Sequence, residues 1–229
     1  MKIISSHEKE KLASLAFTSF LEQLHSFRNQ RHLIIGLSGG TSLLAFYEAL
    51  RNFFPFLEPE LRKKIRFVFL DERLVPLDHP DSNYRLLSGI LFAPLLEKKL
   101  LSEEQIFAVR TDITDPVMEY FSRVPHIDIG LFGVGPDGHI ASLFPNHPGL
   151  QDKNNGYIMV HDSPKPPSDR ISISIPYVRK ICSVFVFFIG EGKREAYERF
   201  LDTSIREEQC PAKYLLGCED CVVVTDLEG

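Results

Sequence analysis

A glycine-rich turn directly follows an apolar run near the middle of this chain. Residues 127–132 (Ile-Asp-Ile-Gly-Leu-Phe) are typical of a buried strand, and residues 133–139 are Gly-Val-Gly-Pro-Asp-Gly-His. The three glycines permit a tight turn that ends on His139. In an open α/β sheet, ligands bind at the carboxyl ends of the strands. The segment therefore predicts such a sheet, with a histidine placed as an acid or base beside a ligand.

Strand-like and helix-like segments alternate along the rest of the chain. A helix is predicted over residues 8–29 from apolar residues at helical spacing, and further helices are predicted over 41–50, 82–92 and 193–201. Buried strands are predicted from apolar runs over residues 32–37, 65–70, 127–132 and 183–189, with a further apolar run at 222–224. Strands that alternate with helices form mostly parallel sheets covered on both faces. We therefore predict an α/β fold built as a single domain over residues 1–229.

Two shorter β-like runs interrupt this pattern in the second half. Residues 157–161 and 170–175 flank a proline-rich stretch at 163–167. The second run alternates strictly between apolar and polar residues, which is typical of a strand with one face in water. We expect these runs to form a small antiparallel addition to the main sheet.

Composition and charge exclude several classes of protein. The 229 residues suffice for a sizeable core, and the net charge of −5 argues against nucleic acid as a partner. No apolar run reaches the ~20 residues that a membrane helix needs. The N-terminal residues lack the pattern of a signal peptide, so we expect a cytoplasmic protein. A local basic pocket can still bind an anionic small molecule.

The cysteines do not indicate a metal site. Cys218 and Cys221 form a C-x2-C pair, but no second pair and no histidines at ligand spacing lie near it. A redox pair would normally open a helix after a strand, whereas this pair precedes the apolar run. We expect all four cysteines to be reduced thiols and predict no metal.

A second glycine-rich loop, residues 36–42 (Gly-Leu-Ser-Gly-Gly-Thr-Ser), joins a predicted strand to a predicted helix. A turn of this kind exposes the backbone N–H groups of Gly39 and Gly40 at the N-terminus of the predicted helix, a geometry that binds phosphate. Ser38 and Thr41 add hydroxyl donors. The loop is neither G-x-G-x-x-G nor a Walker A loop, so no dinucleotide or nucleoside triphosphate is implied. The alternative is a tight turn with a Ser or Thr helix cap.

Charged residues end the strand predicted at 65–70. Asp71 and Glu72 are costly to bury unless they are paired. Arg73 either pairs with them or faces an anionic ligand. In the loop after strand 127–132, Asp137 precedes His139 by two residues and either orients the imidazole or binds a sugar hydroxyl.

Three further residues, a histidine and two cations, are candidates for the same site. Of the eight histidines, His147 is the nearest competitor of His139. Arg170 opens the alternating run, and Lys193 lies at a predicted strand-to-helix turn. Both suit a phosphate, the arginine as a bidentate donor and the lysine as a point charge. The alternative for each is a solvated surface charge.

Taken together, these segments resemble the 6-phosphogluconolactonases of the glucosamine/galactosamine-6-phosphate isomerase superfamily. The resemblance runs in order from about Leu33 to Lys193. It rests on residues 38–41 (Ser-Gly-Gly-Thr), 71–73 (Asp-Glu-Arg) with 82–83 (Ser-Asn), 133–145, 164–167 (Pro-Lys-Pro-Pro) before Arg170, and 190–193 (Gly-Glu-Gly-Lys). No single motif decides, but their ordered combination is specific.

The resemblance implies a Rossmann-like three-layer α/β/α fold, similar to glucosamine-6-phosphate deaminase and ribose-5-phosphate isomerase. It implies hydrolysis of 6-phospho-D-glucono-1,5-lactone, the second step of the oxidative pentose phosphate pathway, without a metal or organic cofactor. The expected partner is thus a sugar-phosphate lactone, with no nucleic acid or membrane, and the expected state is a monomer or weak homo-oligomer. The implied catalytic residues are His139, Asp137 and Arg73, and the implied substrate-binding residues are Ser38, Gly39, Gly40, Thr41, Asp71, Asn83, Arg170 and Lys193.

The chain departs from the family pattern in three places. Ser42 replaces a usual proline, the sequence ends at residues 225–229 where relatives usually continue into a short helix, and no tryptophan occurs. Two alternatives stay open. In glucosamine-6-phosphate deaminases the histidine loop continues Ala-Phe-Asn-Glu-Pro, with a catalytic glutamate, whereas residues 141–145 are Ala-Ser-Leu-Phe-Pro. A non-catalytic sugar-phosphate sensor would carry a DNA-binding segment, for which we find no room. Both comparisons favour the lactonase.

Overall fold

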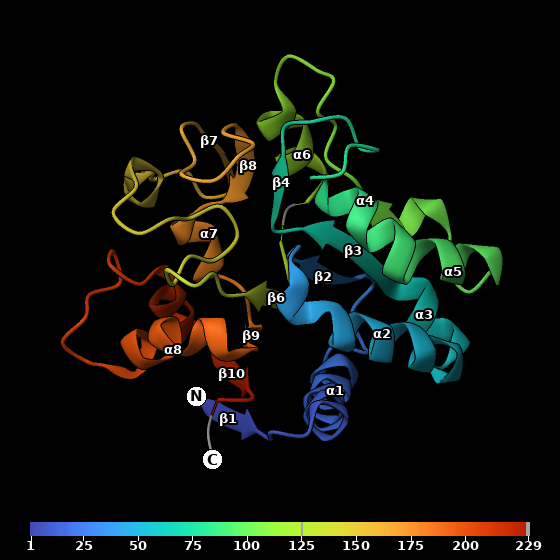
Figure 1. Ribbon diagram of the computed structural model, residues 1–229. Coiled ribbons are helices and arrows are strands. Elements are labelled where there is room, and N and C mark those ends of the chain that lie inside the picture. The colour runs from blue at the N-terminus through green and yellow to red at the C-terminus, as the bar shows by residue number, and fades with distance from the viewer. Residues whose placement is uncertain (125, 228–229) are drawn as a thin grey trace.

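A seven-stranded sheet, parallel throughout, forms the centre of the molecule (Figure 1). The computed structural model describes residues 1–124 and 126–227. The strand order is β1-β10-β9-β6-β2-β3-β5. The strands span Lys2–Ser5 (β1), Leu33–Leu37 (β2), Ile65–Phe69 (β3), Ile106–Phe107 (β5), Ile129–Gly133 (β6), Ser183–Phe188 (β9) and Asp220–Thr225 (β10).

The four predicted buried strands are confirmed to within two residues at each end. They are β2, β3, β6 and β9, and every residue of β2 and β9 is buried. A strand covered on both faces needs apolar side chains on both, which is why these segments are nearly continuous apolar runs. The edge strands β1 and β5 were not predicted, because four and two residues are too short to show a periodicity.

Helices cover both faces of this sheet. They span Lys9–Ser26 (α1), Leu44–Phe53 (α2), Pro59–Lys64 (α3), Asn83–Leu87 (α4), Ala93–Glu97 (α5), Pro116–Arg123 (α6), Ile175–Val178 (α7) and Arg194–Leu201 (α8). The helix predicted at 82–92 is α4 followed by a π-helical segment, Ser88–Phe92. Because parallel crossovers are right-handed, connections toward β5 and connections toward β1 lie on opposite faces. Figure 1 shows α1 and α2 on one side of the sheet and α8 on the other. The predicted three-layer α/β/α fold is confirmed.

The direction of the chain through the sheet reverses between β2 and β6. From β2 the chain moves to β3 and β5, at one edge, and it then returns to β6 and continues through β9 to β10. Since β2 and β6 are neighbours whose connections leave in opposite directions, a crevice forms outside their carboxyl ends. The two predicted glycine-rich loops follow these two strands.

A second, three-stranded sheet lies beyond the carboxyl ends of the main strands (Figure 1). Its strands are Asp71–Arg73 (β4), Arg170–Ile173 (β8) and Tyr157–Val160 (β7), paired antiparallel in the order β4-β8-β7. The antiparallel addition is confirmed, and it also includes β4, for which no strand was predicted. The predicted wet face of residues 170–175 is wrong. Ser172 and Ser174 are fully buried and form hydrogen bonds with backbone groups, so this strand needs no contact with water.

Cys210, Cys218 and Cys221 are buried, and Cys182 is half-buried. All four cysteines are free thiols. Burial raises the pKa of Cys218 to about 12 and that of Cys221 to about 11, so both resist ionisation. Among the residues that the structure describes, no helix is long and apolar enough to span a bilayer.

Candidate functional site

A pocket of about 320 Å³ opens at the carboxyl ends of β2 and β6, where the chain reverses direction. Ten of the eleven predicted site residues line it, and the eleventh, Asp137, is hydrogen-bonded to His139. The remaining lining residues are Ser42, Gly133, Val134, Gly135, Pro136, Ala141 and Lys165. Residues that are far apart in the sequence thus meet at the place where this fold class binds its ligands.

The glycine loop between β2 and α2 presents open backbone N–H groups. Gly40 has φ +95°, and a Cβ there would meet nothing within 4 Å, so it faces open space. A Cβ on Gly39 would lie 1.9 Å from Oδ1 of Asn83, so glycine lets the loop pack against that amide. Over residues 39–41, no backbone N–H has a hydrogen-bond acceptor in the part of the chain described. Unpaired N–H groups ahead of a helix suit a phosphate.

Ser38 holds this loop in place. Its N–H donates to the carbonyl of Leu131 at 3.1 Å, and its carbonyl accepts the Tyr47 hydroxyl at 2.6 Å. Its Oγ is buried and has no partner among the described residues. Hydrogen bonds to β6 and α2 therefore hold the loop at Ser38, while Gly40 and Thr41 stay exposed and line the pocket.

A second turn with nearly the same backbone conformation follows β9. Gly190 has φ +91° and ψ 149°, compared with +95° and 166° for Gly40, and both precede a 3₁₀ turn and a helix. At Gly190 the N–H donates to Oδ1 of Asp226 at 2.8 Å, so this turn binds a carboxylate of the protein itself. The turn at Gly40 offers the same kind of donor to the open pocket. Lys193 lies at the end of the second turn and lines the pocket.

Asp137 and His139 form a hydrogen-bonded pair after β6. Nδ1 of the imidazole lies 2.5 Å from Oδ1 of the carboxylate. An ionised carboxylate can only accept, so this hydrogen bond assigns the proton to Nδ1 and leaves the lone pair on Nε2. A Cβ on Gly135 would lie 2.0 Å from Nδ1, so glycine leaves the space that the pair occupies. Of the two roles left open for Asp137, the geometry supports orienting the imidazole.

The carboxylate of Asp137 is held in its charged form. Partial burial acts to raise the pKa of Asp137, but the hydrogen bond and charge of His139 and the charge of Lys165 outweigh burial. The pKa of Asp137 therefore lies well below its usual range. Phe144 packs against the other side of the imidazole, with ring centroids 4.6 Å apart.

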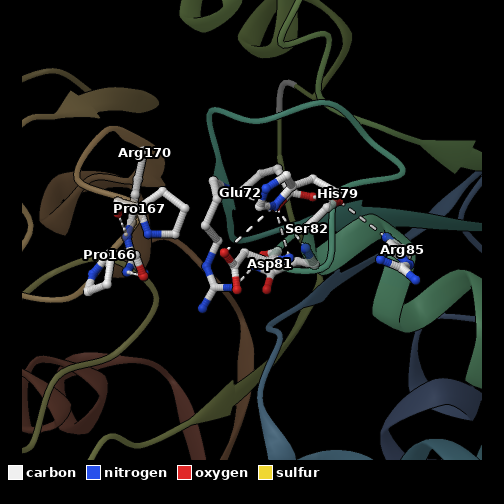
Figure 2. Close-up of polar contacts among 10 residues, drawn as sticks. Glu72, His79, Asp81, Ser82, Arg85, Pro166, Pro167 and Arg170 are labelled. Atoms are coloured by element: carbon white, nitrogen blue, oxygen red, sulfur yellow. Dashed lines mark hydrogen bonds and ion pairs between the residues drawn. The ribbon is translucent and has the colours of Figure 1, made fainter.

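Glu72 is buried on β4 without an ion pair among the residues that the structure describes (Figure 2). Its carboxylate accepts three backbone N–H groups, from β4 and the start of α4, and the Ser82 hydroxyl. Burial raises the pKa of Glu72, and the N–H donors counteract this. Arg73 does not pair with the acids of its own strand. Its guanidinium donates to the carbonyl of Asp81 and lines the pocket, so the alternative of facing an anionic ligand stays open.

Asp71, Asn83 and Ser142 form a buried network at the pocket. Oδ2 of Asp71 accepts the Ser142 hydroxyl at 2.7 Å, and Oδ1 accepts Nδ2 of Asn83 at 3.3 Å. Asp71 and Asn83 were predicted site residues, whereas Ser142 was not singled out, because it lay within the histidine motif without a titratable group. The network fixes the orientation of a carboxylate that faces the pocket.

Arg170 is a buried residue rather than a solvated surface charge. Its guanidinium donates to the carbonyls of Pro167 and Lys165 at 3.0 and 2.8 Å. Figure 2 shows Arg170 beside Pro166 and Pro167. It also lies 5.5 Å over the ring of Phe144. Burial lowers the pKa of Arg170, and the nearby Asp71 carboxylate opposes that shift. Arg170 therefore both lines the pocket and holds the proline-rich segment beside it.

Lys165 is the pocket residue that sequence reasoning missed. It was quoted within the motif at 164–167, but only the arginine that follows was singled out. The structure places Nζ of Lys165 3.6 Å from Oδ1 of Asp137. Burial and this neighbouring ammonium lower the pKa of Lys193.

His147 is not part of the pocket. Its Nδ1 accepts the N–H of Gly149 at 3.0 Å, so Nε2 carries the proton and donates to the carbonyl of His161. Both ring nitrogens are thus used in local structure. In residues 1–124 and 126–227, no group of three or more histidine, cysteine or acidic side chains is arranged to hold a metal ion.

Comparisons with known proteins were made for sequence and structure. Residues 7–224 match the family described as glucosamine-6-phosphate isomerases/6-phosphogluconolactonase. A 6-phosphogluconolactonase of Borreliella burgdorferi is 32% identical over 236 residues, covering 100% of this chain and 97% of that protein.

Two solved structures are similar over nearly the whole chain. A 6-phosphogluconolactonase from Thermotoga maritima superimposes with a TM-score of 0.82 at 22% identity, covering 98% of this chain and 99% of its own. A monomeric glucosamine-6-phosphate deaminase gives a TM-score of 0.80 at 21% identity, covering 99% and 97%. At these identities the structural likeness shows the shared fold.

Proposed function

The chain belongs to the family of glucosamine-6-phosphate isomerases and 6-phosphogluconolactonases, and we propose that it hydrolyses 6-phospho-D-glucono-1,5-lactone to 6-phospho-D-gluconate. This reaction is the second step of the oxidative pentose phosphate pathway. The observation that carries the proposal is the Asp137–His139 pair at the end of β6, which leaves Nε2 of the imidazole free beside a cation-lined pocket. A free imidazole nitrogen can activate the water that hydrolyses an ester, and the cations of the pocket suit the phosphate of this substrate.

His139 acts as the general base and then as the general acid. Nε2 takes a proton from a water molecule while the water oxygen attacks C1 of the lactone. The tetrahedral intermediate collapses with cleavage of the bond between C1 and the ring oxygen, and the imidazolium returns the proton to that oxygen. Asp137 keeps the proton on Nδ1 and stabilises the imidazolium, since its carboxylate is charged and 2.5 Å away.

Positive groups hold the phosphate and the developing oxyanion. The open N–H groups of Gly39, Gly40 and Thr41, with the ammonium of Lys193, bind the phosphate remote from C1. Arg170 adds charge to this side. Arg73 faces the pocket from β4, next to the Asp71–Asn83 network that positions the sugar, and stabilises the oxyanion.

Phe144 separates this reaction from that of the deaminases. It occupies the position at which the deaminase loop, by the resemblance above, carries a catalytic glutamate. Here the Phe144 ring packs on the imidazole at 4.6 Å and contributes no proton. The reaction left to the pair is therefore the hydrolysis of the lactone.

A coupled assay tests the proposal. Glucose-6-phosphate dehydrogenase generates the lactone, and 6-phosphogluconate dehydrogenase reports the product as it forms. The lactone also opens spontaneously, so the rate is compared with a blank without protein and with His139→Gln. Acceleration by the wild type that His139→Gln lacks supports the proposal. A folded wild type that does not accelerate the reaction, but releases ammonia from glucosamine 6-phosphate, contradicts it.

Location and assembly are separate proposals. We place the protein in the cytoplasm, as a monomer or weak homo-oligomer, and its net charge of −5 supports the absence of nucleic acid as a partner. Light scattering behind size-exclusion chromatography gives the mass in solution. A mass that stays above that of one 26.1 kDa chain on dilution contradicts a monomer or weak homo-oligomer.

A further inference from the structure

A proline-rich strap, residues 163–168, brings a lysine to the acid–base pair. Nζ of Lys165 lies 3.6 Å from Oδ1 of Asp137 and 3.5 Å from Nδ1 of His139. The lysine side chain is less than half exposed, and Lys165 lines the pocket. The proposed mechanism gives Lys165 no role, although no other cation of the described residues has a hydrogen bond or ion pair with this pair.

The strap is fixed at its base, so the position of Lys165 is built into the fold. The Arg170 guanidinium donates to the carbonyls of Lys165 and Pro167 at 2.8 and 3.0 Å. Ser163 closes the strap by a backbone hydrogen bond to Ser168 at 3.0 Å, and its hydroxyl donates to the Lys165 carbonyl at 2.9 Å. Arg170 itself is buried, so the strap is anchored to the interior of the protein. The anchored backbone therefore places the Lys165 ammonium beside Asp137 and His139.

The two contacts of the ammonium have opposite character. Nδ1 carries a proton that it donates to Asp137, so Lys165 and Nδ1 are both donors and share the carboxylate as their acceptor. The ammonium therefore attracts the carboxylate and repels a positively charged imidazole. It favours a neutral imidazole aligned on an ionised Asp137, which is the state that takes a proton from water.

Other charged and titratable groups face the imidazole more weakly. Lys193 acts on both Lys165 and Asp137 from the turn after β9. Arg170 and His147 each contact the Phe144 ring, and within the described residues neither forms a hydrogen bond or ion pair with the imidazole. Cys210 packs beneath Gly138 of the histidine loop, and burial raises the pKa of this thiol, so it carries no charge near neutral pH. Lys165 is the closest positive charge in this set.

We propose that Lys165 is a positioning residue of the active site, whose ammonium holds Asp137 on Nδ1 of His139 and opposes a second proton on the imidazole between turnovers. The catalytic consequence of this inference rests on the proposed function. The effect of Lys165 on the imidazole does not depend on the substrate, so a titration of His139 tests the inference separately from lactone hydrolysis.

The first experiment titrates His139 by NMR in the ligand-free protein. Wild type, Lys165→Met and Lys165→Arg are compared, and His139→Gln assigns the signal among the eight histidines. Lys180→Met, at an exposed lysine outside the pocket, is the matched control. Removing a positive charge about 4 Å away from a partly exposed imidazole raises its titration midpoint by ~0.5–1 pH unit. Lys165→Arg restores the wild-type midpoint, and Lys180→Met leaves it unchanged.

The second experiment measures kcat/KM for lactone hydrolysis against pH on the same variants. The acidic limb, where protonation of His139 abolishes activity, moves to higher pH in Lys165→Met by the amount seen in the titration. KM changes by less than about threefold, since the lysine acts on the base. An unmoved titration midpoint overturns the inference, as does a raised KM with an unmoved acidic limb, which makes Lys165 a substrate ligand. If the midpoint shifts in Lys165→Met but the wild type does not hydrolyse the lactone, the proposed function alone is overturned.

Discussion

Gly135→Ala tests whether the turn after β6 serves to align Asp137 with His139. A Cβ at Gly135 would lie 2.0 Å from Nδ1 and 2.1 Å from Cε1 of His139, and 2.6 Å from Oδ1 of Asp137. Ordinary contact begins at 3.4 Å, so the imidazole must move by about 1.4 Å, the difference between 3.4 and 2.0 Å. The φ of Gly135 is not in the left-handed region, so alanine fits its backbone and the effect is one of side-chain contact.

A displacement of this size separates the imidazole from the carboxylate and from the water it activates. A 1 Å misplacement costs about 10²-fold in rate, so we expect kcat to fall by ~10²-fold or more. KM changes little, because the glycine loop and Lys193 are elsewhere in the pocket. The lost hydrogen bond to a charged group is worth ~1.5–3 kcal/mol, and rotation of the imidazole into the open pocket recovers part of it. We therefore expect the free energy of unfolding to fall by about 1–2 kcal/mol.

The assay is steady-state lactone hydrolysis, with urea unfolding measured in parallel. Gly89→Ala makes the same chemical change where a Cβ meets nothing within 4 Å, and it leaves kcat unchanged. A folded Gly135→Ala enzyme with a kcat within twofold of the wild type refutes the reasoning. Such a result means that the Asp137–His139 alignment is not needed for turnover.

The remaining predictions concern the base, the phosphate and acid stability. His139→Gln lowers kcat by ~10²–10⁴-fold with little change in KM, which steady-state kinetics measures. Lys193→Met instead raises KM by ~10-fold or more and largely spares kcat, and the reverse pattern contradicts its placement at the phosphate. The folded pKa of Asp137 is depressed, so its stabilisation is complete above about pH 4 and is lost as the pH falls below that value. The difference in unfolding free energy between wild type and Asp137→Asn therefore narrows from pH 6 to pH 2.5 in urea titrations, and a constant difference argues against the shift.

The central sheet was predictable because its strands are buried on both faces. A strand such as β9 must be apolar at every position, and this leaves a run that local sequence alone displays. The glycine loop and the histidine turn follow such strands, so their place at the edge of the sheet followed from the fold class. The position of the pocket between β2 and β6 agrees with that reasoning.

The second sheet and its strap were not predictable in the same way. β4 is three residues long and charged, and it is a strand only because β8 lies beside it. Ser172 suggested a face in water, whereas its hydroxyl accepts the N–H of the distant Ser142 and donates to the Ile173 carbonyl within a buried strand. The contact of Lys165 with the acid–base pair depends on the anchoring of the strap by Arg170. These features arise from tertiary pairing, which local patterns do not encode.

The reversal of the chain between β2 and β6 has a consequence for any use of this protein. The pocket takes walls from segments as distant in sequence as Ser38 and Lys193, and they meet only when the strands between them are in register. A fragment that carries the histidine turn alone therefore has the proposed general base, His139, without the residues that would bind a substrate. Turnover is then a sensitive reporter of the intact fold. A partly unfolded population lowers the measured rate in proportion to its share, without changing KM.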